Sequence, residues 1–380
     1  MISRLLKELP APPEGKFGWP WTEETVYIGD NLNSNRVSLP IISIVTPSFN
    51  QGEFIEETIR SILLQNYPNL EYIIVDGGSD DGTIDVINKY KKWIDVVISE
   101  KDSGQSDAIN KGLRLIKGDI FNWINSDDFL DPGALFNVAE ACISQPDKKV
   151  FYFNRNMIYE DGSEKIEEAG DLFDDAIVFC NPPIIQQGIF YTAEAVKKMG
   201  ELSTILHYTM DYDWWLRFLF LFGKEKIFHE PKSIANMRIH GDSKTSLYPA
   251  QFAGNVATIL YSMCNQLNIK QFTEVLESKF ELQPGYEFPT KINPLQKELV
   301  NRMLSIFLLK QLNLVFTKID YQNARIISKI DWNKMNLNDS EKKWLENLKL
   351  NVAPSNWIFF RIRRKLKYLN KLISAELRDR

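Results

Sequence analysis

The sequence predicts an α/β fold, a doubly wound and mostly parallel sheet over residues 39–247 with a helical C-terminal region appended. Two observations carry this prediction. Short apolar runs rich in β-branched residues alternate with segments whose apolar residues recur at helical spacing. Each run also ends in a short polar loop, and strand, loop and helix repeating with short connections are typical of parallel sheets.

The elements follow one another in a regular order. Four strands are predicted, at residues 41–45, 72–75, 96–98 and 120–124. Helices follow the first three, at residues 54–63, 84–90 and 107–115. Because ligands of open α/β sheets bind outside the carboxyl ends of the strands, the four loops at that edge form the predicted binding site.

The fourth strand ends in Asn125-Ser126-Asp127-Asp128, the most informative stretch of the chain. Adjacent carboxylates repel unless a cation lies beside them. Hard divalent cations take such oxygen ligands and bring phosphate oxygens with them. The alternative is a polar loop with a helix cap, since Asp and Ser are common in both.

The downstream half of this region contains three further features. Residues 150–153 are predicted as a strand and residues 158–166 as a hairpin on an Asp-Gly turn. Residues 182–188 are expected to be extended and to line an acceptor side. A strongly apolar helix then begins at Met210-Asp211, with Asp213 two residues further on.

Four motifs occur in the order T-P-S-F-N-Q, V-D-G-G-S-D-D-G-T, D-S-G-Q-S-D-A-I-N-K-G and N-S-D-D. In this order, each at a strand end, they resemble the family 2 glycosyltransferases with the GT-A fold. The resemblance covers roughly Ile41 to Thr245 and implies an inverting enzyme that uses a nucleotide-sugar donor. It implies nucleotide contacts for seven residues, namely Thr46, Pro47, Phe49, Asp76, Asp102, Gly104 and Asn110.

Asp76 carries the preference for UDP among these residues. In the family this position binds the base of a uridine-type nucleotide, and a carboxylate accepts well from the imide N–H that uracil has and adenine lacks. A helix-cap or turn role is the alternative for Asp76.

The D-x-D element of the family maps onto Asn125 and Asp127, so this chain lacks one of its two charges. Asn125, with Ser126, is therefore expected to contact sugar or ribose hydroxyls. Asp127 is the preferred ligand of Mn²⁺ or Mg²⁺, and Asp128 is the second choice. His240 lies in R-I-H, which resembles the closing R-x-H element whose imidazole reaches the metal or diphosphate, and it would suit a site poor in carboxylates.

The segment M-D-Y-D-W-W-L-R resembles the E-D-x-x-L-W-x-R element of the family. The resemblance makes Asp211 the catalytic base, while Met210 replaces the usual acid before it. Asp211 and Asp213 are alternatively favourable acids in the first turn of a helix, near its positive end.

Composition agrees with an ordinary enzyme of 380 residues, which is long enough for two domains. The net charge of −5 argues against a nucleic-acid partner for the whole chain. The three cysteines form neither a zinc spacing nor a disulfide framework, which suits a reducing cytoplasm. No apolar run reaches the ~18 residues that span a bilayer, and no signal peptide is recognised. The membrane spans and Q-x-x-R-W element of processive synthases are absent from the sequence.

The two ends of the chain predict separate regions. Residues 1–38 form a proline-rich strap, expected to dock through Trp19 and Trp21. Residues 248–380 are expected to be helical. Their last part, residues 357–380, alternates basic with apolar side chains, which is typical of an anchor on the inner membrane face. Packing on its own domain or on a dimer partner is the alternative, so the oligomeric state stays open.

The predicted function is metal-dependent transfer of a sugar, from a UDP-sugar by preference, to a glycan or lipid-linked acceptor in bacterial surface polysaccharide synthesis. A sugar nucleotidyltransferase is one alternative, although its first loop would normally be basic and Thr46 to Gly52 contains no basic residue. A non-catalytic glycan-binding module is the other. The donor sugar and the linkage are not readable from the sequence.

Overall fold

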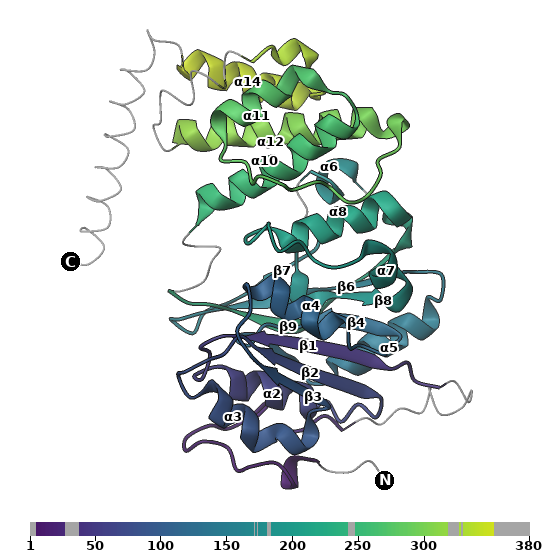
Figure 1. Ribbon diagram of the computed structural model, residues 1–380, viewed down its shortest axis with the longest axis vertical. Helices are drawn as coiled ribbons and strands as arrows, with labels where there is room; N and C mark the ends of the chain where they lie inside the picture. Colours follow the sequence, from purple (N-terminus) through teal and green to yellow (C-terminus); the bar gives the residue numbers. More distant parts are fainter. Residues whose placement is uncertain are drawn as a thin grey trace, which may run out of the picture. The chain divides into compact units, whose positions relative to one another are not determined.

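The computed structural model describes residues 5–26, 38–170, 172, 174–180, 184–241, 248–317, 327 and 330–352. The chain divides into two compact units (Figure 1). The first unit comprises Met1–Val256 with Gln283–Thr290 and contains the sheet, and the second comprises Ala257–Leu282 with Lys291–Arg380.

The sheet of the first unit has nine strands within the described residues, in the order β3-β2-β1-β4-β8-β6-β9-β5, with β7 paired to β6. The strands are β1 Ile42–Ser48, β2 Leu70–Asp76, β3 Val96–Ser99, β4 Ile120–Trp123, β5 Phe129–Leu130, β6 Val150–Tyr159, β7 Glu164–Glu167, β8 Ile189–Thr192 and β9 Ile227–Ile239. Strands β1 to β4 are parallel, as predicted, and β8 is antiparallel to β4 and β6. The predicted α/β fold is confirmed, but the sheet is mixed, since four of its eight strand pairings within the described residues are antiparallel.

Helices cover both faces of this sheet. They are α2 Ile55–Leu63, α3 Thr83–Tyr90, α4 Gln105–Leu113, α5 Ala134–Ser144, α6 Asp175–Val178, α7 Ala193–Met199 and α8 Met210–Phe222. Figure 1 shows α2 and α3 on the side of β1–β3 opposite to α4. The predicted helix at 107–115 begins two residues earlier, at Gln105.

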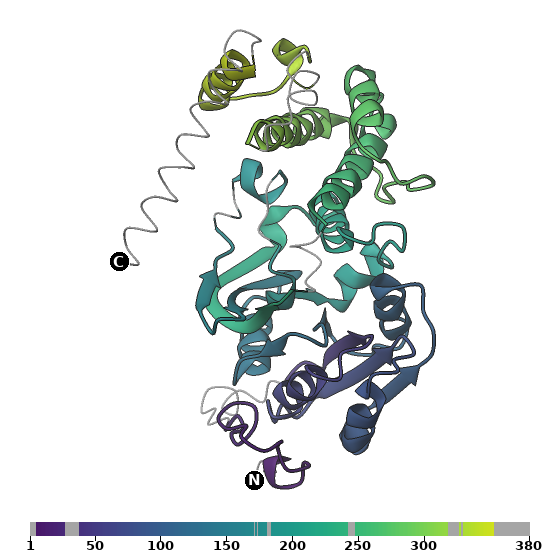
Figure 2. The same ribbon diagram turned by 90° about the vertical axis from the view of Figure 1, so that its left-hand side faces the viewer.

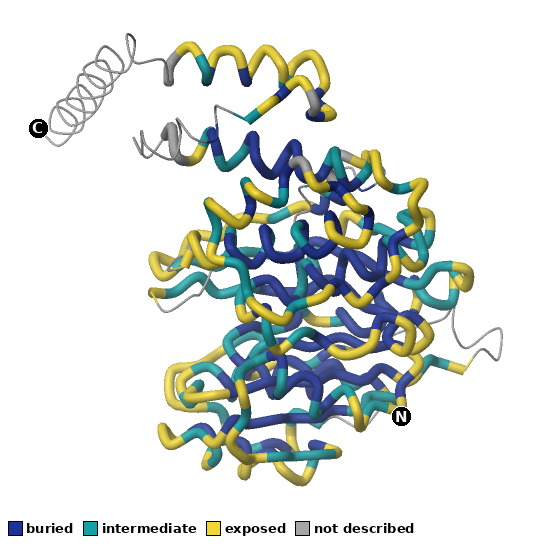
Figure 3. The backbone as a smooth tube through the Cα atoms, turned by 45° about the horizontal axis from the view of Figure 1, so that its top comes forward, coloured by how far each residue is buried: buried dark blue, intermediate teal, exposed yellow. Residues whose placement is uncertain are grey.

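Alternation along the strands explains these two layers. Ile42 and Ile44 point into a core cluster with α2, α3 and α5, while Val45 faces α4 on the other side of the sheet. Gly112 of α4 lies so close to Val45 that an added Cβ would be 2.6 Å from Val45 Cγ1. Both faces of the central strands are thus buried, as a parallel sheet requires, and Figure 3 shows these strands inside the unit.

Strand β1 is longer than predicted and includes Thr46 and Pro47, which the sequence placed in a loop. Pairing of β1 with β4 ends at Val45, whereas pairing with β2 continues to Ser48. Pro47 therefore needs no N–H on the β4 side, which is why a proline is tolerated here. The prediction of a loop at these two residues was wrong for that reason.

The N-terminal strap docks on the first unit through its tryptophans, as expected. The Trp19 indole N–H donates to the carbonyl of Leu130 at 2.7 Å, and Trp21 is buried. Fully buried Arg60 of α2 donates to the carbonyls of Pro10, Pro20 and Trp21 at 2.9, 3.0 and 2.6 Å. The strap's described residues, 5–26, form the purple loops below α2 and α3 in Figure 1 and the purple loops near the N-terminus in Figure 2.

We expect Arg60→Leu to detach this strap. The change leaves three carbonyls without their donor, and each buried unsatisfied group costs about 1–3 kcal/mol. The melting temperature should fall by many degrees, and limited proteolysis should cut first within residues 5–26. Arg114→Leu is the matched control, because Arg114 forms an exposed pair with Glu201 and such pairs contribute about 0–1 kcal/mol. Equal melting temperatures for the two variants would contradict the role of Arg60.

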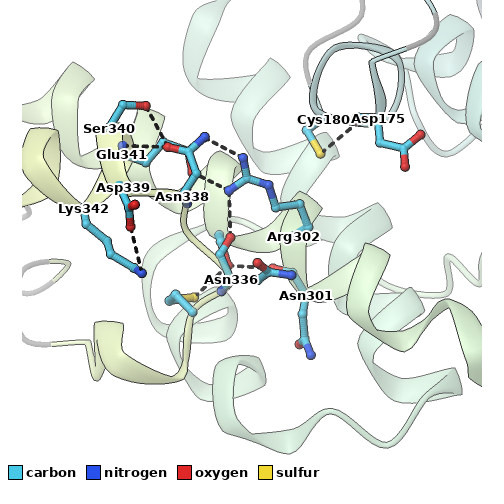
Figure 4. Close-up of polar contacts among 12 residues, drawn as sticks. Asp175, Cys180, Asn301, Arg302, Asn336, Asn338, Asp339, Ser340, Glu341 and Lys342 are labelled. Atoms are coloured by element: carbon cyan, nitrogen blue, oxygen red, sulfur yellow. Dashed lines mark hydrogen bonds and ion pairs between the residues drawn. The ribbon is translucent and has the colours of Figure 1, made fainter.

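The second unit is helical within its described residues, which confirms a helical C-terminal region. The unit contains α11 Thr273–Lys279, α12 Lys297–Thr317 and α14 Asp339–Val352, together with the part of α10 (Pro249–Gln266) from Ala257 onward. Arg302 of α12 binds both carboxylate oxygens of Glu341 in α14 and donates to the Asn336 carbonyl at 2.7 Å (Figure 4). These hydrogen bonds hold α14 against α12.

No helix among the described residues is long and apolar enough to cross a membrane. The predicted basic anchor at 357–380 lies outside the described residues. Contact with a membrane surface, and the cytoplasmic location expected with it, therefore remain predictions.

Candidate active site

Strand register brings the predicted loops to one edge of the sheet. Ser48 of β1 is paired with Asp76 of β2, and Asp76 is paired with Ser99 of β3. Val45 is paired with Trp123, so the loop after β4 leaves the sheet beside the end of β1. The candidate site therefore lies where the sequence placed it, at the carboxyl ends of β1 to β4.

The first two loops are hydrogen-bonded to each other. The Asn50 N–H donates to Ser79 Oγ at 2.8 Å, and Asn50 Oδ1 accepts from the Asp80 N–H at 3.1 Å. Phe49 lies between strand and loop with 59% of its surface exposed. Thr46, by contrast, is fully buried with its hydroxyl 3.1 Å from the Tyr72 hydroxyl. Of these residues, Phe49 offers an open aromatic face to a ligand.

Asp76 is fully buried, and its carboxylate is engaged by its own loop. Oδ2 accepts from the N–H groups of Gly78 and Ser79, both at 3.0 Å, and from Ser99 Oγ at 2.9 Å. Oδ1 accepts from Ser79 Oγ. These bonds shape the loop beside Phe49, and recognition of a base by Asp76 stays a prediction.

The third loop has little room for side chains. Asp102 Oδ1 accepts from the Gly104 N–H at 2.8 Å, and a Cβ on Gly77 would lie 2.7 Å from Asp102 Oδ2. Gly104 has φ +108°, which favours glycine. Asn110 is buried and holds the backbone of Leu202 with both ends of its amide, at 2.8 and 2.9 Å. In this structure Asn110 supports the fold behind the loop, and its predicted nucleotide contact gains no support.

The loop after β4 brings together the predicted metal ligands. Asp127 keeps 27% of its side chain exposed, and its Oδ2 lies 3.2 Å from His240 Nε2, although the two residues are 113 positions apart. The Thr58 hydroxyl holds the loop from behind by donating to the carbonyls of Ser126 and Asp128, at 2.9 and 2.6 Å. Asp127 and His240 thus face each other from two elements.

Asp128 has a different environment from that of Asp127. It is buried, and its carboxylate accepts from Asn125 Nδ2 at 3.1 Å, Gln187 Nε2 at 2.6 Å and the Arg238 N–H at 3.3 Å. Burial, followed by the neighbouring charge of Asp127, raises the pKa of Asp128 to about 7. A carboxylate surrounded by protein donors is a poorer candidate for a metal ligand than exposed Asp127.

The R-x-H segment at the end of β9 is anchored by aromatic rings. The Arg238 guanidinium lies over Phe54 and Phe129, 5.5 and 4.6 Å from their centroids, and pairs with Glu57 at 2.8 Å. The same guanidinium donates to the Asp127 carbonyl. The His240 ring stacks on Phe54 at 5.2 Å between centroids. These contacts fix the imidazole beside Asp127.

Asp211 and Asp213 lie two residues apart in α8, so their side chains point in different directions and differ in burial. Asp211 is partly buried, and its Oδ1 accepts from the Tyr212 N–H at 2.8 Å. Burial raises the pKa of the Asp211 carboxyl above its ordinary range. Asp213 is fully buried and bound by Arg217 and by the Tyr286 hydroxyl. Only Asp211 is therefore available to take a proton.

Sequence reasoning missed three polar residues behind this site, of which Gln187 and Arg155 are buried and Gln105 is partly exposed. Gln105, Gln187 and Arg155 connect through side-chain hydrogen bonds to Asn125 and Asp128. Gln105 and Gln187 occur in segments that the motifs had singled out, but no pattern shows that their amides meet the loop after β4. The signal available in the sequence was polar residues inside otherwise apolar or glycine-rich segments.

Within the described ranges, no group of three or more His, Cys, Asp or Glu side chains is arranged to hold a metal. The pair of Asp127 and His240 offers two ligands of the types that Mn²⁺ accepts, and one of them is partly open to solvent. A nucleotide diphosphate and water would have to supply the rest. The residues present fit a cation that arrives with its substrate.

Parts of this chain are similar to known glycosyltransferases. Residues 43–188 match the family model "Glycosyl transferase family 2". A protein of Bacillus subtilis named as a teichuronic acid biosynthesis glycosyltransferase, TuaG, is 42% identical over 92 residues, which cover 23% of this chain and 36% of TuaG. An uncharacterised glycosyltransferase of Rickettsia typhi is 27% identical over 226 residues, covering 54% of this chain and 66% of that protein. The chain thus spans between about a third and two thirds of these relatives.

Two solved structures show the fold. TarS 1–349 of S. aureus, in complex with UDP-GlcNAc, has a TM-score of 0.51 at 15% identity, with 82% of this chain and 90% of that chain covered. The mannosyltransferase PcManGT of Pyrobaculum calidifontis, in complex with GDP-Man and Mn²⁺, has a TM-score of 0.51 at 14% identity, with 84% and 88% covered. The predicted GT-A architecture is therefore confirmed at the level of the fold.

Proposed function

We propose that this chain, whose residues 43–188 match the family 2 glycosyltransferase model, transfers a sugar from a nucleotide-diphosphate donor, by preference a UDP-sugar, to a hydroxyl group of a glycan or lipid-linked acceptor. The meeting of Asp127 and His240 at 3.2 Å carries this proposal, because it forms a cation-binding pair beside the nucleotide loops. A role in cell-surface polysaccharide synthesis is supported by the name of TuaG.

We propose that Asp127 and His240 hold Mn²⁺ or Mg²⁺ with the donor diphosphate. Such a cation acts as a Lewis acid and neutralises charge on the leaving phosphate. Asp128 supports the loop, since its carboxylate is occupied by three protein donors. Asn125 and Ser126 remain proposed contacts of ribose or sugar hydroxyls.

Nucleotide binding is proposed for the loops beside this pair. The exposed ring of Phe49 offers a surface for the base, and the loops carrying Asp76 and Asp102 enclose its edge. UDP is favoured because Asp76 lies at the family position that reads uracil.

Asp211 is the proposed base of a single displacement. The acceptor hydroxyl gives its proton to the Asp211 carboxylate while its oxygen bonds to the anomeric carbon of the donor sugar. The bond between that carbon and the diphosphate oxygen breaks, and its electron pair leaves with the nucleoside diphosphate. One displacement inverts the anomeric configuration.

A thermal-shift panel of nucleotide sugars, each with and without Mn²⁺, tests the proposed donor. A ligand at 100 times its dissociation constant stabilises the folded protein by about 2.7 kcal/mol. UDP-sugars with Mn²⁺ should give the largest shift, and their turnover should release UDP. Formation of UTP and a sugar 1-phosphate from the UDP-sugar and added pyrophosphate would indicate a nucleotidyltransferase instead, and stabilisation by free glycans alone would indicate a binding module.

A further inference from the structure

Two short runs of hydrogen bonds meet at one oxygen of the buried Asp128 carboxylate. Gln187 Nε2 and Asn125 Nδ2 both donate to Asp128 Oδ2, at 2.6 and 3.1 Å. Further out, Gln105 Nε2 donates to Asn125 Oδ1 at 2.8 Å, and Arg155 Nη1 donates to Gln187 Oε1 at 2.6 Å. The runs connect α4, the loop after β4, the 3₁₀ helix η3 Gln186–Gly188 and β6, so the prediction of an extended segment was wrong for these three residues.

Chemistry fixes the direction of these bonds. A guanidinium has donors only, so Gln187 must turn its carbonyl oxygen to Arg155 and its NH₂ group to Asp128. Arg155 is itself held by Glu167 of β7, whose Oε2 accepts from Arg155 Nε at 2.9 Å. The amide of Gln187 therefore has one satisfactory orientation.

Burial makes this orientation consequential. Gln187 is 3% exposed and Asp128 is 2% exposed, so water does not replace a lost partner. A buried polar run that is fully satisfied specifies one arrangement, whereas a mismatched pair is costly. The other oxygen of Asp128 accepts from the N–H of Arg238, two residues before His240. Asp128 is thereby held between Gln187 and β9, which ends at Ile239, one residue before His240.

We propose that Gln187 is a positioning residue, which holds the loop Asn125–Asp128 through Asp128 so that neighbouring Asp127 faces His240. The inference rests on the proposed function, since it assigns Asp127 and His240 to the metal. Gln187 itself need not touch donor or acceptor. Gln187 would set the distance between Asp127 and His240. Its loss should therefore weaken the binding of nucleotide in the presence of metal.

The test is Gln187→Glu, with UDP affinity measured by calorimetry in Mn²⁺ and in EDTA. The change keeps the bond to Arg155 but turns a carboxylate oxygen toward the Asp128 carboxylate. UDP affinity in Mn²⁺ should fall at least tenfold, while affinity in EDTA should stay within about twofold. Gln187→Met removes both polar ends of the side chain at similar volume. It should also lower the ratio of the UDP affinity in Mn²⁺ to that in EDTA, and it replaces the first variant if that variant does not fold.

A second substitution restores the pairing. In Gln187→Glu combined with Asp128→Asn, the new amide can donate to the new carboxylate, and Asn125 and Gln105 can accommodate it by turning their amides over. The double variant should recover most of the Mn²⁺-dependent affinity. No recovery would overturn the pairing of Gln187 with Asp128 as the cause.

Gln186→Glu is the matched control. Gln186 is 7% exposed and donates to Asn122 Oδ1 and to the Trp123 carbonyl at 3.1 and 2.6 Å, without a bond to Asp128. It should lower the melting temperature yet keep the ratio of UDP affinities in Mn²⁺ and EDTA. An equal loss of that ratio in Gln186→Glu, or a normal ratio in both Gln187→Glu and Gln187→Met, would overturn the inference. Wild-type binding that ignores Mn²⁺ would instead overturn the proposed metal site, and this inference with it.

Discussion

Asp211→Asn should reduce the rate of sugar transfer about 10²–10⁴-fold, since that is the usual contribution of a positioned base. The amide keeps the oxygen that accepts from the Tyr212 N–H, so α8 should begin as before. It cannot take the acceptor proton at neutral pH. UDP affinity should change little, because the proposed role of Asp211 concerns the acceptor and not the diphosphate. Steady-state kinetics and calorimetry on the same preparation separate the two effects.

Asp85→Asn is the control for this prediction. Asp85 is an exposed acid in the first turn of α3. It therefore has the same favourable position near a helix N-terminus, but it has no proposed role in the candidate active site. Its transfer rate should stay normal. If Asp211→Asn also transfers at a normal rate, Asp211 is only a helix-end acid and the base lies elsewhere.

The pH dependence of wild-type kcat follows from the same residue. Burial raises the pKa of Asp211, and a base works only when deprotonated. The rate should therefore fall as the pH is lowered through that raised pKa, at a higher pH than the ordinary carboxyl value of 3.8. In Asp211→Asn this acid limb should disappear from the residual activity. An unchanged limb in the variant would mean that another group titrates.

Asp127→Ala should bring UDP binding in Mn²⁺ down to the level measured in EDTA. Charge-assisted contacts contribute about 1.5–3 kcal/mol, so the loss should be roughly 10- to 100-fold in affinity. His240→Ala should act in the same direction, because His240 faces the same carboxylate at 3.2 Å. Calorimetric titration of UDP with and without Mn²⁺ measures both variants.

Asp161→Ala is the control for Asp127→Ala. Asp161 is an exposed acid in the turn between β6 and β7, where it binds only Ser163 among the contacts described. Its loss should leave UDP binding unchanged in both conditions. Wild-type binding that is indifferent to EDTA would exclude a metal-dependent donor site.

Local patterns were sufficient for strands β1 to β4, for helices α2, α3, α4 and α8, and for the edge of the sheet that carries the site, but they did not locate β5, β8 or β9. Apolar runs located β1 to β4, and the Asp-Gly turn located the hairpin of β6 and β7. The patterns were less reliable at the ends of elements. Pro47 belongs to β1 because pairing with β4 stops at Val45, and the sequence of β1 alone does not show where a neighbouring strand stops pairing.

The candidate site, too, was predicted only in part. Spacing and motif order brought Asp127 and His240 forward, since both lie in segments that resemble family elements. The sequence could not show that Asn110 binds Leu202, or that Gln187 and Arg155 meet behind Asp128, because those contacts join residues far apart in the chain. The difference between Asp127 and Asp128 likewise came from burial, which two adjacent identical residues do not reveal.

The central claim is that this site performs one in-line displacement on a UDP-sugar, and the anomeric configuration of the product tests it most directly. The purified chain, an α-linked UDP-sugar and an acceptor should give a β-linked product, read from the anomeric coupling constant by NMR. An α-linked product would require two displacements or a front-face mechanism, for which Asp211 as sole base does not suffice. That result would contradict the account.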